Sequence, residues 1–285
     1  MINPTWTNIQ KQSDEILSDG LNKLKSSPYY GFSYIAEKNP GNYLISLNRV
    51  PYYIGEAKEL SKRIKQQSKP ATSTFYKNYQ KFVKNRLIPK VSIDKFNIQC
   101  IPTFIGRKEI EEFGIVNLLT RLNSFQLDKR GEFKIANHKG LWDRVQQNFE
   151  SFLKEGESKI LRTNFIPWFD LSISSSAGLY LVKNKSDKLI YIGESSDVGE
   201  RITTHSGRTY FSALRRHIGT EILGYKLQEI NGKKRYFSIS EDTRITDFLK
   251  TCKATTFKVS FGRFELEEYL IKRYRPLLNI KDNKE

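Results

Sequence analysis

The feature that most constrains the fold of this chain is an internal repeat. The segment from Gly106 to Asn123 aligns without a gap on the segment from Gly262 to Asn279, and both begin Gly-Arg-x-Glu-x-Glu-Glu. Earlier in the chain, Tyr53-Ile-Gly-Glu56 matches Tyr191-Ile-Gly-Glu194. This repeat predicts two copies of one small domain, the second with additional residues between its matching ends.

Each copy contains the same order of expected elements: two short strands joined by a turn, a helix, a basic aromatic helix, a further strand and a long helix that carries the repeat. In the first copy the first four elements are expected at residues 43–47, 52–54, 57–67 and 75–85. In the second copy they are expected at residues 179–182, 189–192, 196–205 and 211–218. The additional residues of the second copy contain Asn231-Gly232 between two apolar stretches, a pattern that predicts an inserted hairpin with arms at 227–230 and 235–239.

These elements predict an α+β fold with two tandem domains, each a small and mainly antiparallel three-stranded sheet flanked by helices. Leu141, Val145, Phe149 and Phe152 stand at helical spacing between the copies, so a packed helical connector is expected to join them. The predicted divisions are an N-terminal helical segment at 1–30, a first domain at 31–135, the connector at 136–171 and a second domain at 172–285.

Charge indicates the class of partner. The chain has 48 Lys and Arg against 31 Asp and Glu, a formal net charge of +17, which favours a polyanion such as nucleic acid. A membrane surface is disfavoured, because no basic amphipathic helix with a strongly apolar opposite face is apparent. The polar N-terminus and the lack of a long apolar run predict a cytoplasmic protein. Cys100 and Cys252 have no partner at ligand spacing, so neither a zinc site nor a disulfide is expected.

Two segments interleave basic and aromatic residues, at 75–86 and 208–217. Such segments suit contacts to DNA phosphates with occasional packing against sugars or bases. An ordinary amphipathic helix in a basic protein would give a similar pattern, and both interpretations stay open.

Five residue types recur in the same order in both copies: Tyr, Tyr, Arg, Glu and Asn. In the second copy they are Tyr180 of Gly178-Leu-Tyr180, Tyr191 of Tyr191-Ile-Gly193, Arg201, Glu267 and Asn279. In the first copy they are Tyr43 of Gly41-Asn-Tyr43, Tyr53 of Tyr53-Ile-Gly55, Arg63, Glu111 and Asn123. In this order and context they resemble the motifs of the GIY-YIG nuclease superfamily, and the second copy resembles it more closely.

The placement of the acidic residue can be judged without the family. On a helical wheel Glu267 shares a face with Leu270 and Ile271, whereas Glu265 points away, and Glu111 repeats this placement. A carboxylate on an apolar face is costly unless a positive group meets it. That group is either a divalent cation or the arginine of an ordinary salt bridge.

The resemblance implies divalent-metal-dependent hydrolysis of DNA phosphodiester bonds, with Mg²⁺ on Glu267 and on Glu111 and Mn²⁺ able to take its place. It implies that Arg201 grips the scissile phosphate and that Tyr180 is the general base, its pKa lowered by Arg201 and the metal. Tyr191 would orient the water or the phosphate. Asn279 is expected to fix the end of its helix.

The copies differ at one further position. His205 follows Arg201 by one helical turn, so the two side chains share a face. The resemblance implies that His205 is a proton donor or a phosphate contact, and the alternative is an ordinary surface imidazole. The first copy has Gln67 there, and Asn42 where the motif usually has an apolar residue, so the first copy is either a second cutting site or a degenerate DNA-gripping domain.

The resemblance and the charge predict a site-specific type II restriction endonuclease that cuts both strands of double-stranded DNA. Its two sites in one chain would make it a monomer with an internal pseudo-dimer. One alternative is a structure-specific nuclease of DNA repair or of a mobile element. An alternative of another class is a non-catalytic DNA-binding protein with relic nuclease domains.

Overall fold

The computed structural model describes residues 4–34, 36–88, 90–123, 140–171 and 175–280. The chain divides into two compact units, Met1–Phe152 (unit 1) and Leu153–Glu285 (unit 2). The domain boundaries expected at residues 135 and 172 lie outside the described residues. Among the described residues, no helix is long and apolar enough to cross a membrane.

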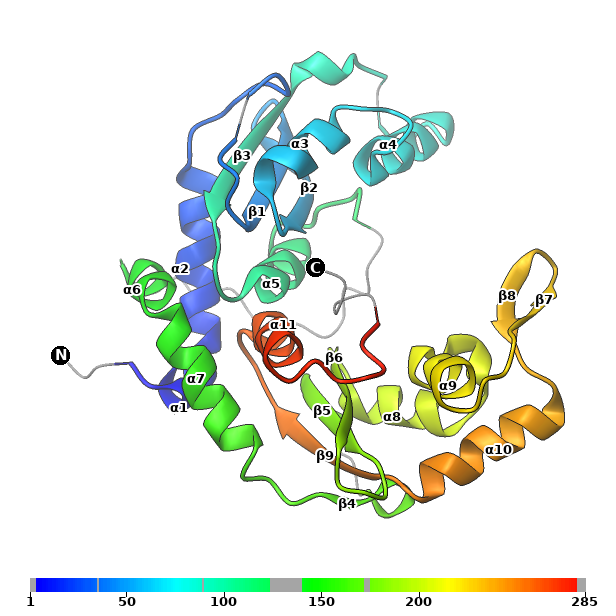
Figure 1. Ribbon diagram of the computed structural model, residues 1–285. Helices are drawn as coiled ribbons and strands as arrows, with labels where there is room; N and C mark the ends of the chain where they lie inside the picture. The colour runs from blue at the N-terminus through cyan, green and yellow to red at the C-terminus, as the bar shows by residue number, and fades with distance from the viewer. Residues whose placement is uncertain (1–3, 35, 89, 124–139, 172–174, 281–285) are drawn as a thin grey trace. The chain divides into compact units, whose positions relative to one another are not determined.

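Unit 1 is built on a three-stranded antiparallel sheet with the order β2-β1-β3 (Figure 1). Helices α2 and α5 pack on one face of this sheet, and α3 and α4 cover the other. The elements of unit 1 are α1 (Trp6–Lys11), α2 (Ser13–Ser26), β1 (Gly41–Leu47), β2 (Val50–Ala57), α3 (Leu60–Gln67), α4 (Thr74–Lys84), η1 (Ile93–Lys95), β3 (Phe96–Pro102), α5 (Arg107–Asn117) and α6 (Leu141–Gln147).

The β1-β2 hairpin is specified by its turn residues and by the alternation of its side chains between the two faces of the sheet. Asn48 and Arg49 both have positive φ, of 51° and 64°, which matches the twist of the two flanking strands. Tyr43 and Tyr53 then point to the face covered by α3 and α4, where they join the buried cluster of that face. Ile54 points to the opposite face, where it meets Gly114 of α5. The alternation thus assigns the tyrosines and the long helix to opposite faces.

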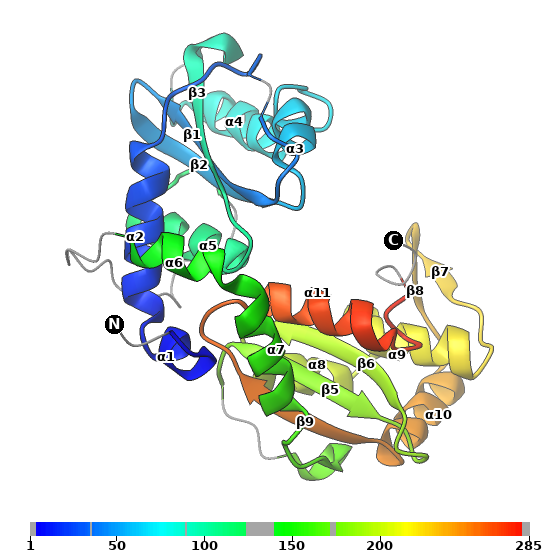
Figure 2. The ribbon, with the colours of Figure 1, turned by 60° about the vertical axis from the view of Figure 1, so that its left-hand side comes forward.

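Unit 2 repeats this sheet and extends it, with the order β4-β9-β5-β6. Without β4, and starting from β6, the strand order is β6-β5-β9. This order and its antiparallel pairing match β2-β1-β3 of unit 1. Figure 2 shows α11 on one face of the sheet, with α8 and α9 on the other. The elements are β4 (Ile166–Pro167), η2 (Trp168–Asp170), β5 (Gly178–Lys183), β6 (Leu189–Ser195), α8 (Val198–Ser206), η3 (Thr209–Phe211), α9 (Ala213–His217), η4 (Ile218–Ile222), β7 (Gln228–Ile230), β8 (Lys233–Tyr236), α10 (Ile239–Lys250), β9 (Lys253–Lys258) and α11 (Arg263–Tyr274).

The additional residues of unit 2 form more than the expected hairpin. Asn231 and Gly232, with φ of 52° and 72°, do turn β7 into β8. The predicted second arm at 235–239 is wrong at its end, because Ser238 and Glu241 form a capping box that starts α10. The insertion is therefore a hairpin followed by a helix.

The basic aromatic helix expected at 211–218 is also broken up. The hydroxyl of Ser212 accepts a hydrogen bond from the backbone N–H of Arg215 at 3.0 Å and so caps α9. The residues before it form η3, and the residues after His217 continue as the π-helical turn η4. The N-cap residue Ser212 therefore starts a new helix within the segment that the apolar spacing predicted to be one helix.

Within the predicted connector, α6 packs against α2 in unit 1. Trp142 is buried, its ring lies over Gly20, and its backbone N–H donates to Asp19 at 2.8 Å. Helix α7 (Phe149–Ile160) follows, and the division between the two units falls within it. The apolar stripe of residues 141–152 is therefore part of a packed core.

Asn279 does not fix the end of its helix as expected, since α11 has already ended at Tyr274. Its side chain instead clamps one peptide group of the neighbouring strand: Nδ2 donates to the Ile192 carbonyl at 2.8 Å, and Oδ1 accepts from the Ile192 N–H at 3.0 Å. In unit 1 Asn123 makes the same two bonds to Ile54, at 2.8 and 3.0 Å. Both asparagines tie the segment after the long helix to the second strand of the hairpin.

This clamp gives the first prediction. Asn279→Ala should lower the free energy of unfolding by about 2–3 kcal/mol, because it removes two hydrogen bonds and leaves a buried strand peptide unsatisfied. Urea denaturation followed by circular dichroism measures the change. Asn123→Ala is the matched variant in unit 1 and should cost a similar amount. An unchanged midpoint for Asn279→Ala would show that the clamp contributes nothing.

Candidate active site

The two tyrosines of unit 2 lie together on the face of β5 and β6 that α8 and α9 cover. Tyr180 is buried, Tyr191 nearly so, and their ring centroids are 5.9 Å apart. Gly193 pairs with Tyr180 across the hairpin, and a side chain at Gly193 would overlap the Tyr180 hydroxyl. The glycine of the Tyr-Ile-Gly motif therefore gives the phenol room to cross over the neighbouring strand.

His205 meets the Tyr180 hydroxyl from α8. Its Nε2 lies 2.7 Å from the Tyr180 oxygen, and its Nδ1 lies 2.6 Å from Oγ of Ser212. The ring is fully buried, so the expectation of an ordinary surface imidazole is wrong. Ser212, which caps α9, was not singled out from the sequence. Tyr180, His205 and Ser212 form a continuous hydrogen-bonded chain.

The protonation of this chain follows from its surroundings. Burial lowers the pKa of His205 well below its ordinary value of 6.5, and the charges of Arg201, Arg215 and Arg216 lower it further. The ring is therefore neutral at pH 7. One of its nitrogens can then accept a hydrogen bond while the other donates one.

The charge of Arg201 does not by itself bring the pKa of Tyr180 below its ordinary value. Burial raises the pKa of its hydroxyl well above the ordinary value of 10, the neighbouring Tyr191 adds to this, and Arg201 opposes it without prevailing. The phenol thus carries its proton at neutral pH. To take a proton from water it must pass its own to an acceptor, and the neutral His205 is in hydrogen-bond contact.

Glu267 lies on α11, half-buried, with Oε1 accepting from the backbone N–H of Glu194 at 3.0 Å. The carboxylate of Glu194 in turn pairs with the buried Arg263, Nε to Oε2, at 2.8 Å. Neither Glu194 nor Arg263 was singled out from the sequence, although both recur in the repeat. Their unit 1 counterparts, Glu56 and Arg107, also pair, at 3.8 Å.

The helical wheel was wrong about Glu265. That residue is buried, whereas Glu267 is only half-buried. A wheel assumes one covered face, but α11 is covered on more than one side. Besides the sheet, the α7 residue Glu157 accepts from the hydroxyl of Tyr269 at 3.0 Å. Contact with a second element decides which side of the helix is exposed.

Glu267 fits Mg²⁺ as a single protein ligand. In the described part of the chain, no group of three or more His, Cys, Asp or Glu side chains could form a metal cage. Mg²⁺ commonly takes one carboxylate and completes its shell with substrate phosphate and water. A single carboxylate such as Glu267 is compatible with that kind of site.

Unit 1 has the same tyrosine pair but a different partner for it. Tyr43 and Tyr53 have ring centroids 6.2 Å apart. Nε2 of the buried Gln67 donates to the Tyr43 hydroxyl at 2.7 Å, and Oγ of Ser73 donates to Oε1 of Gln67 at 2.6 Å. Arg63 Nε also donates to the Tyr43 oxygen, at 3.2 Å. The amide takes the position of the imidazole but cannot accept a proton.

The acidic residue of unit 1 is already paired with a cation. Lys108 Nζ lies 2.7 Å from Glu111 Oε2, whereas the repeat places Phe264 at the corresponding position of unit 2. Burial lowers the pKa of Lys108, but the Glu111 carboxylate outweighs it, so the pKa is raised and the ammonium stays charged. Of the two alternatives for an acid on an apolar helix face, unit 1 has the ion pair, made by a lysine and not by the expected arginine.

The basic aromatic segments combine structural and exposed residues. Arg215 of the second segment is fully buried, where Nη2 pairs with Asp242 at 2.9 Å and so ties α9 to the inserted α10. It is therefore not available for phosphate contacts. In the first segment Phe75 and Tyr79 join the core, while Lys77, Lys81 and Lys84 of α4 are exposed. That helix is amphipathic, with its basic face toward solvent.

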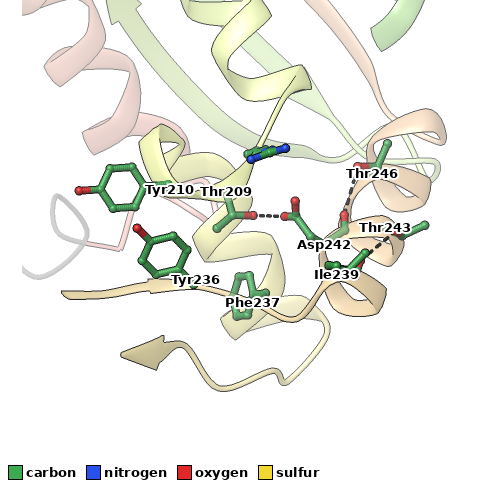
Figure 3. Close-up of a pocket in the computed structure, with 9 residues that line it drawn as sticks. Thr209, Tyr210, Tyr236, Phe237, Ile239, Asp242, Thr243 and Thr246 are labelled. Carbon is green, nitrogen blue, oxygen red and sulfur yellow. Dashed lines mark hydrogen bonds between the residues drawn. The ribbon is translucent and has the colours of Figure 1, made fainter. Parts of the chain in front are cut away.

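The insertion also encloses a cavity of about 460 Å³ between η3, the end of β8 and α10 (Figure 3). The rings of Tyr210 and Tyr236 lie on one side of it, with centroids 5.0 Å apart. On the other side the hydroxyl of Thr209 donates to Asp242. None of the predicted catalytic residues lines this cavity.

Residues 168–285 match the family model of the GIY-YIG catalytic domain. The match lies within unit 2 and contains every predicted site residue of that unit. Comparison with curated proteins and with solved structures found no match. Residues 168–285 are therefore similar to a GIY-YIG catalytic domain.

The buried histidine gives a pH prediction. Above about pH 6.5 the ring is neutral in both folded and unfolded chains, but below it only the unfolded chain binds the proton readily. The free energy of unfolding should therefore decrease on acidification in both proteins, but more steeply in the native protein than in His205→Gln. The difference in slope should be up to about 1.4 kcal/mol per pH unit. Gln is the residue that unit 1 uses there.

Urea denaturation at pH 7.5, 6.5 and 5.5 measures this difference. Comparing the two proteins at each pH cancels the titration of the other groups. Parallel pH profiles would mean that His205 is not buried as a neutral ring.

Proposed function

We propose that this protein is a divalent-metal-dependent DNA endonuclease whose catalytic centre lies in unit 2 and consists of Tyr180, Tyr191, Arg201, His205 and Glu267. The observation that carries the proposal is the buried contact between Tyr180 and a neutral His205, on the sheet that also positions Glu267. The match of this region to a nuclease catalytic domain supports the reaction class.

In the proposed reaction a water molecule attacks the scissile phosphorus in line with the leaving 3′ oxygen. Arg201 binds the phosphate through its planar guanidinium, and Tyr191 orients the water. Tyr180 takes a proton from the water while its own passes to Nε2 of His205, whose Nδ1–H is held by Ser212. The leaving oxygen takes its proton from solvent.

Glu267 would hold Mg²⁺, with Mn²⁺ able to substitute, and the bound ion would neutralise charge on the phosphate and on the leaving oxygen. Asn279 acts on this site through the strand it clamps, so we assign it a positioning role. Glu194 and Arg263 likewise position Glu267.

Double-stranded DNA is the proposed substrate. The net charge of +17 and the exposed lysines of α4 support a polyanion. We favour a site-specific type II restriction endonuclease, with the inserted hairpin and α10 as surface for base contacts. A structure-specific repair or mobile-element nuclease is the alternative within the same chemistry.

We also propose that unit 1 is a second copy of the same domain. The shared strand order, the matching asparagine clamps and the left-handed glycines Gly106 and Gly262 before the long helices support this. As a pseudo-dimer the chain would act as a monomer, which light scattering on the purified protein tests. The Glu111→Ala variant distinguishes a unit 1 that cuts DNA from one that does not.

Removal of the two acids tests the catalytic assignment. Glu267→Ala should slow conversion of supercoiled plasmid by about 10²–10³-fold or more, because the phosphate charge is no longer neutralised. If both units cut one strand each, Glu111→Ala should accumulate nicked circles. If only unit 2 cuts, Glu111→Ala should still produce linear DNA. Full-rate cleavage by Glu267→Ala would exclude unit 2 as the catalytic centre proposed.

The kind of DNA cut is tested with unmodified duplex of known sequence. A site-specific enzyme should give discrete fragments with Mg²⁺ or Mn²⁺ and none with a chelator. A structure-specific enzyme should leave the duplex intact and cut branched or flapped substrates. A native protein that binds DNA but cuts neither substrate would instead be the non-catalytic DNA-binding protein with relic domains.

A further inference from the structure

Glu111 of unit 1 and Glu267 of unit 2 have different neighbours on their helices, and the two helices can be compared position by position. Helices α5 and α11 both begin after a glycine in the left-handed region, Gly106 at φ 91° and Gly262 at φ 82°. Each then presents a buried arginine that pairs with the glutamate of the Tyr-Ile-Gly-Glu segment. Lys108 and Glu111 therefore correspond to Phe264 and Glu267.

We infer that in unit 1 the ammonium of Lys108 takes the place that a divalent cation would take in unit 2, so that unit 1 binds a DNA phosphodiester without metal and does not cut it. This inference rests on the proposed function of Glu267 in unit 2. It assigns unit 1 a ligand class, the DNA phosphate, and a residue, Lys108, for which the resemblance provides no role.

The first observation is the geometry of the pair. Glu111 is 4% exposed, and its Oε2 lies 2.7 Å from Lys108 Nζ. The lysine side chain is 24% exposed and the glutamate side chain 6%, so the lysine is the more accessible member of the pair. A metal at Glu111 would have to displace this ammonium and leave it beside the like charge of the ion. The residues of unit 1 therefore do not fit a divalent cation.

The second observation is independent of the metal and concerns the proton. The Tyr43 oxygen accepts from both Gln67 and Arg63. Neither an amide nitrogen nor a guanidinium can take the phenol proton, whereas His205 can take that of Tyr180. Unit 1 thus differs at both groups that the proposed hydrolysis needs.

The positive groups of unit 1 remain suited to a phosphate. Arg63 Nε lies 3.2 Å from the Tyr43 oxygen, and Lys108 Nζ lies 2.7 Å from Glu111 Oε2. Unit 1 therefore offers a planar guanidinium and an ammonium. These are the two side chains that most often contact DNA phosphates.

The first test removes the charge of Lys108 in the full-length protein. Lys108→Met should weaken binding of a duplex in EDTA, measured by fluorescence anisotropy, and should reduce the slope of log affinity against log salt by about 1, the value for one phosphate contact. Lys11→Met, at an exposed position of α1, is the control for loss of a lysine elsewhere in unit 1 and should change the slope less. An unchanged slope for Lys108→Met would overturn the inference.

The reciprocal change introduces the lysine into unit 2. Phe264→Lys should reduce metal-dependent cleavage at least about 10²-fold while retaining binding in EDTA. Phe264→Met, which brings length without charge, should cut far better than Phe264→Lys. Equal cleavage by the two variants would overturn the inference, and urea denaturation checks that both are folded.

The site used by metal can be read without DNA cleavage. Fe²⁺ with ascorbate and peroxide cuts a polypeptide close to where the ion binds, so the DNA-bound native protein should be cut near Glu267 and not near Glu111. Lys108→Met should add a cut near Glu111 if the lysine excludes the ion. Peptide cutting at Glu111 in the native protein would contradict the inference, whereas absence of metal-dependent DNA cleavage by the native protein would contradict the proposed function.

Discussion

The Tyr180 hydroxyl crosses over Gly193 of the adjacent strand, and the rest of the site is arranged around that buried oxygen. A buried phenol needs a hydrogen-bond partner. The helix after the hairpin therefore brings His205, which Ser212 holds in place from the next turn. Unit 1 meets the same requirement at Tyr43 with Gln67 and Ser73. Both solutions satisfy the phenol, but only the imidazole can also receive its proton.

A second requirement is neutralisation of the glutamates beneath the sheet. In both units a buried arginine at the start of the long helix pairs with the glutamate of the second strand. This leaves one further acid on the helix, Glu111 or Glu267, whose partner differs. A lysine one turn earlier forms an ion pair with Glu111 in unit 1, whereas the repeat has Phe264, a side chain without charge, at the corresponding position of unit 2. The two units therefore differ in the charge next to this acid.

The insertion of unit 2 is fixed to the helices that cover its sheet by the ion pair of the buried Arg215 with Asp242. The guanidinium of Arg215 donates to the His205 carbonyl through Nη1, and to Asp242 and Thr246 of α10 through Nη2. Asp242 and Thr246 also line the cavity beside Tyr210 and Tyr236. The insertion is therefore part of the folded domain, positioned by the segment that follows α8, and not an appended loop.

The sequence by itself determined the repeat, the two hairpins, the long helices and the order of Tyr, Tyr, Arg, Glu and Asn. These features depend on local spacing and on residue type, which the chain carries directly. It also indicated that the acid of each helix needs a positive partner. The sequence could not reveal whether that partner is a side chain or an ion, because Lys108, three residues before Glu111, competes with an ion from solution.

Only the tertiary structure decided the burial of His205 and Glu265, the clamp by Asn279 and the break before α9. Each depends on a contact between segments distant in the chain or on competition between a cap and an apolar stripe. Asn279, for example, lies just beyond a helix and so suggested a helix end, yet its amide matches the peptide of a strand some distance earlier. Local sequence patterns specify helices and strands. The need of buried polar groups for hydrogen-bond partners specifies which of these helices and strands contact each other.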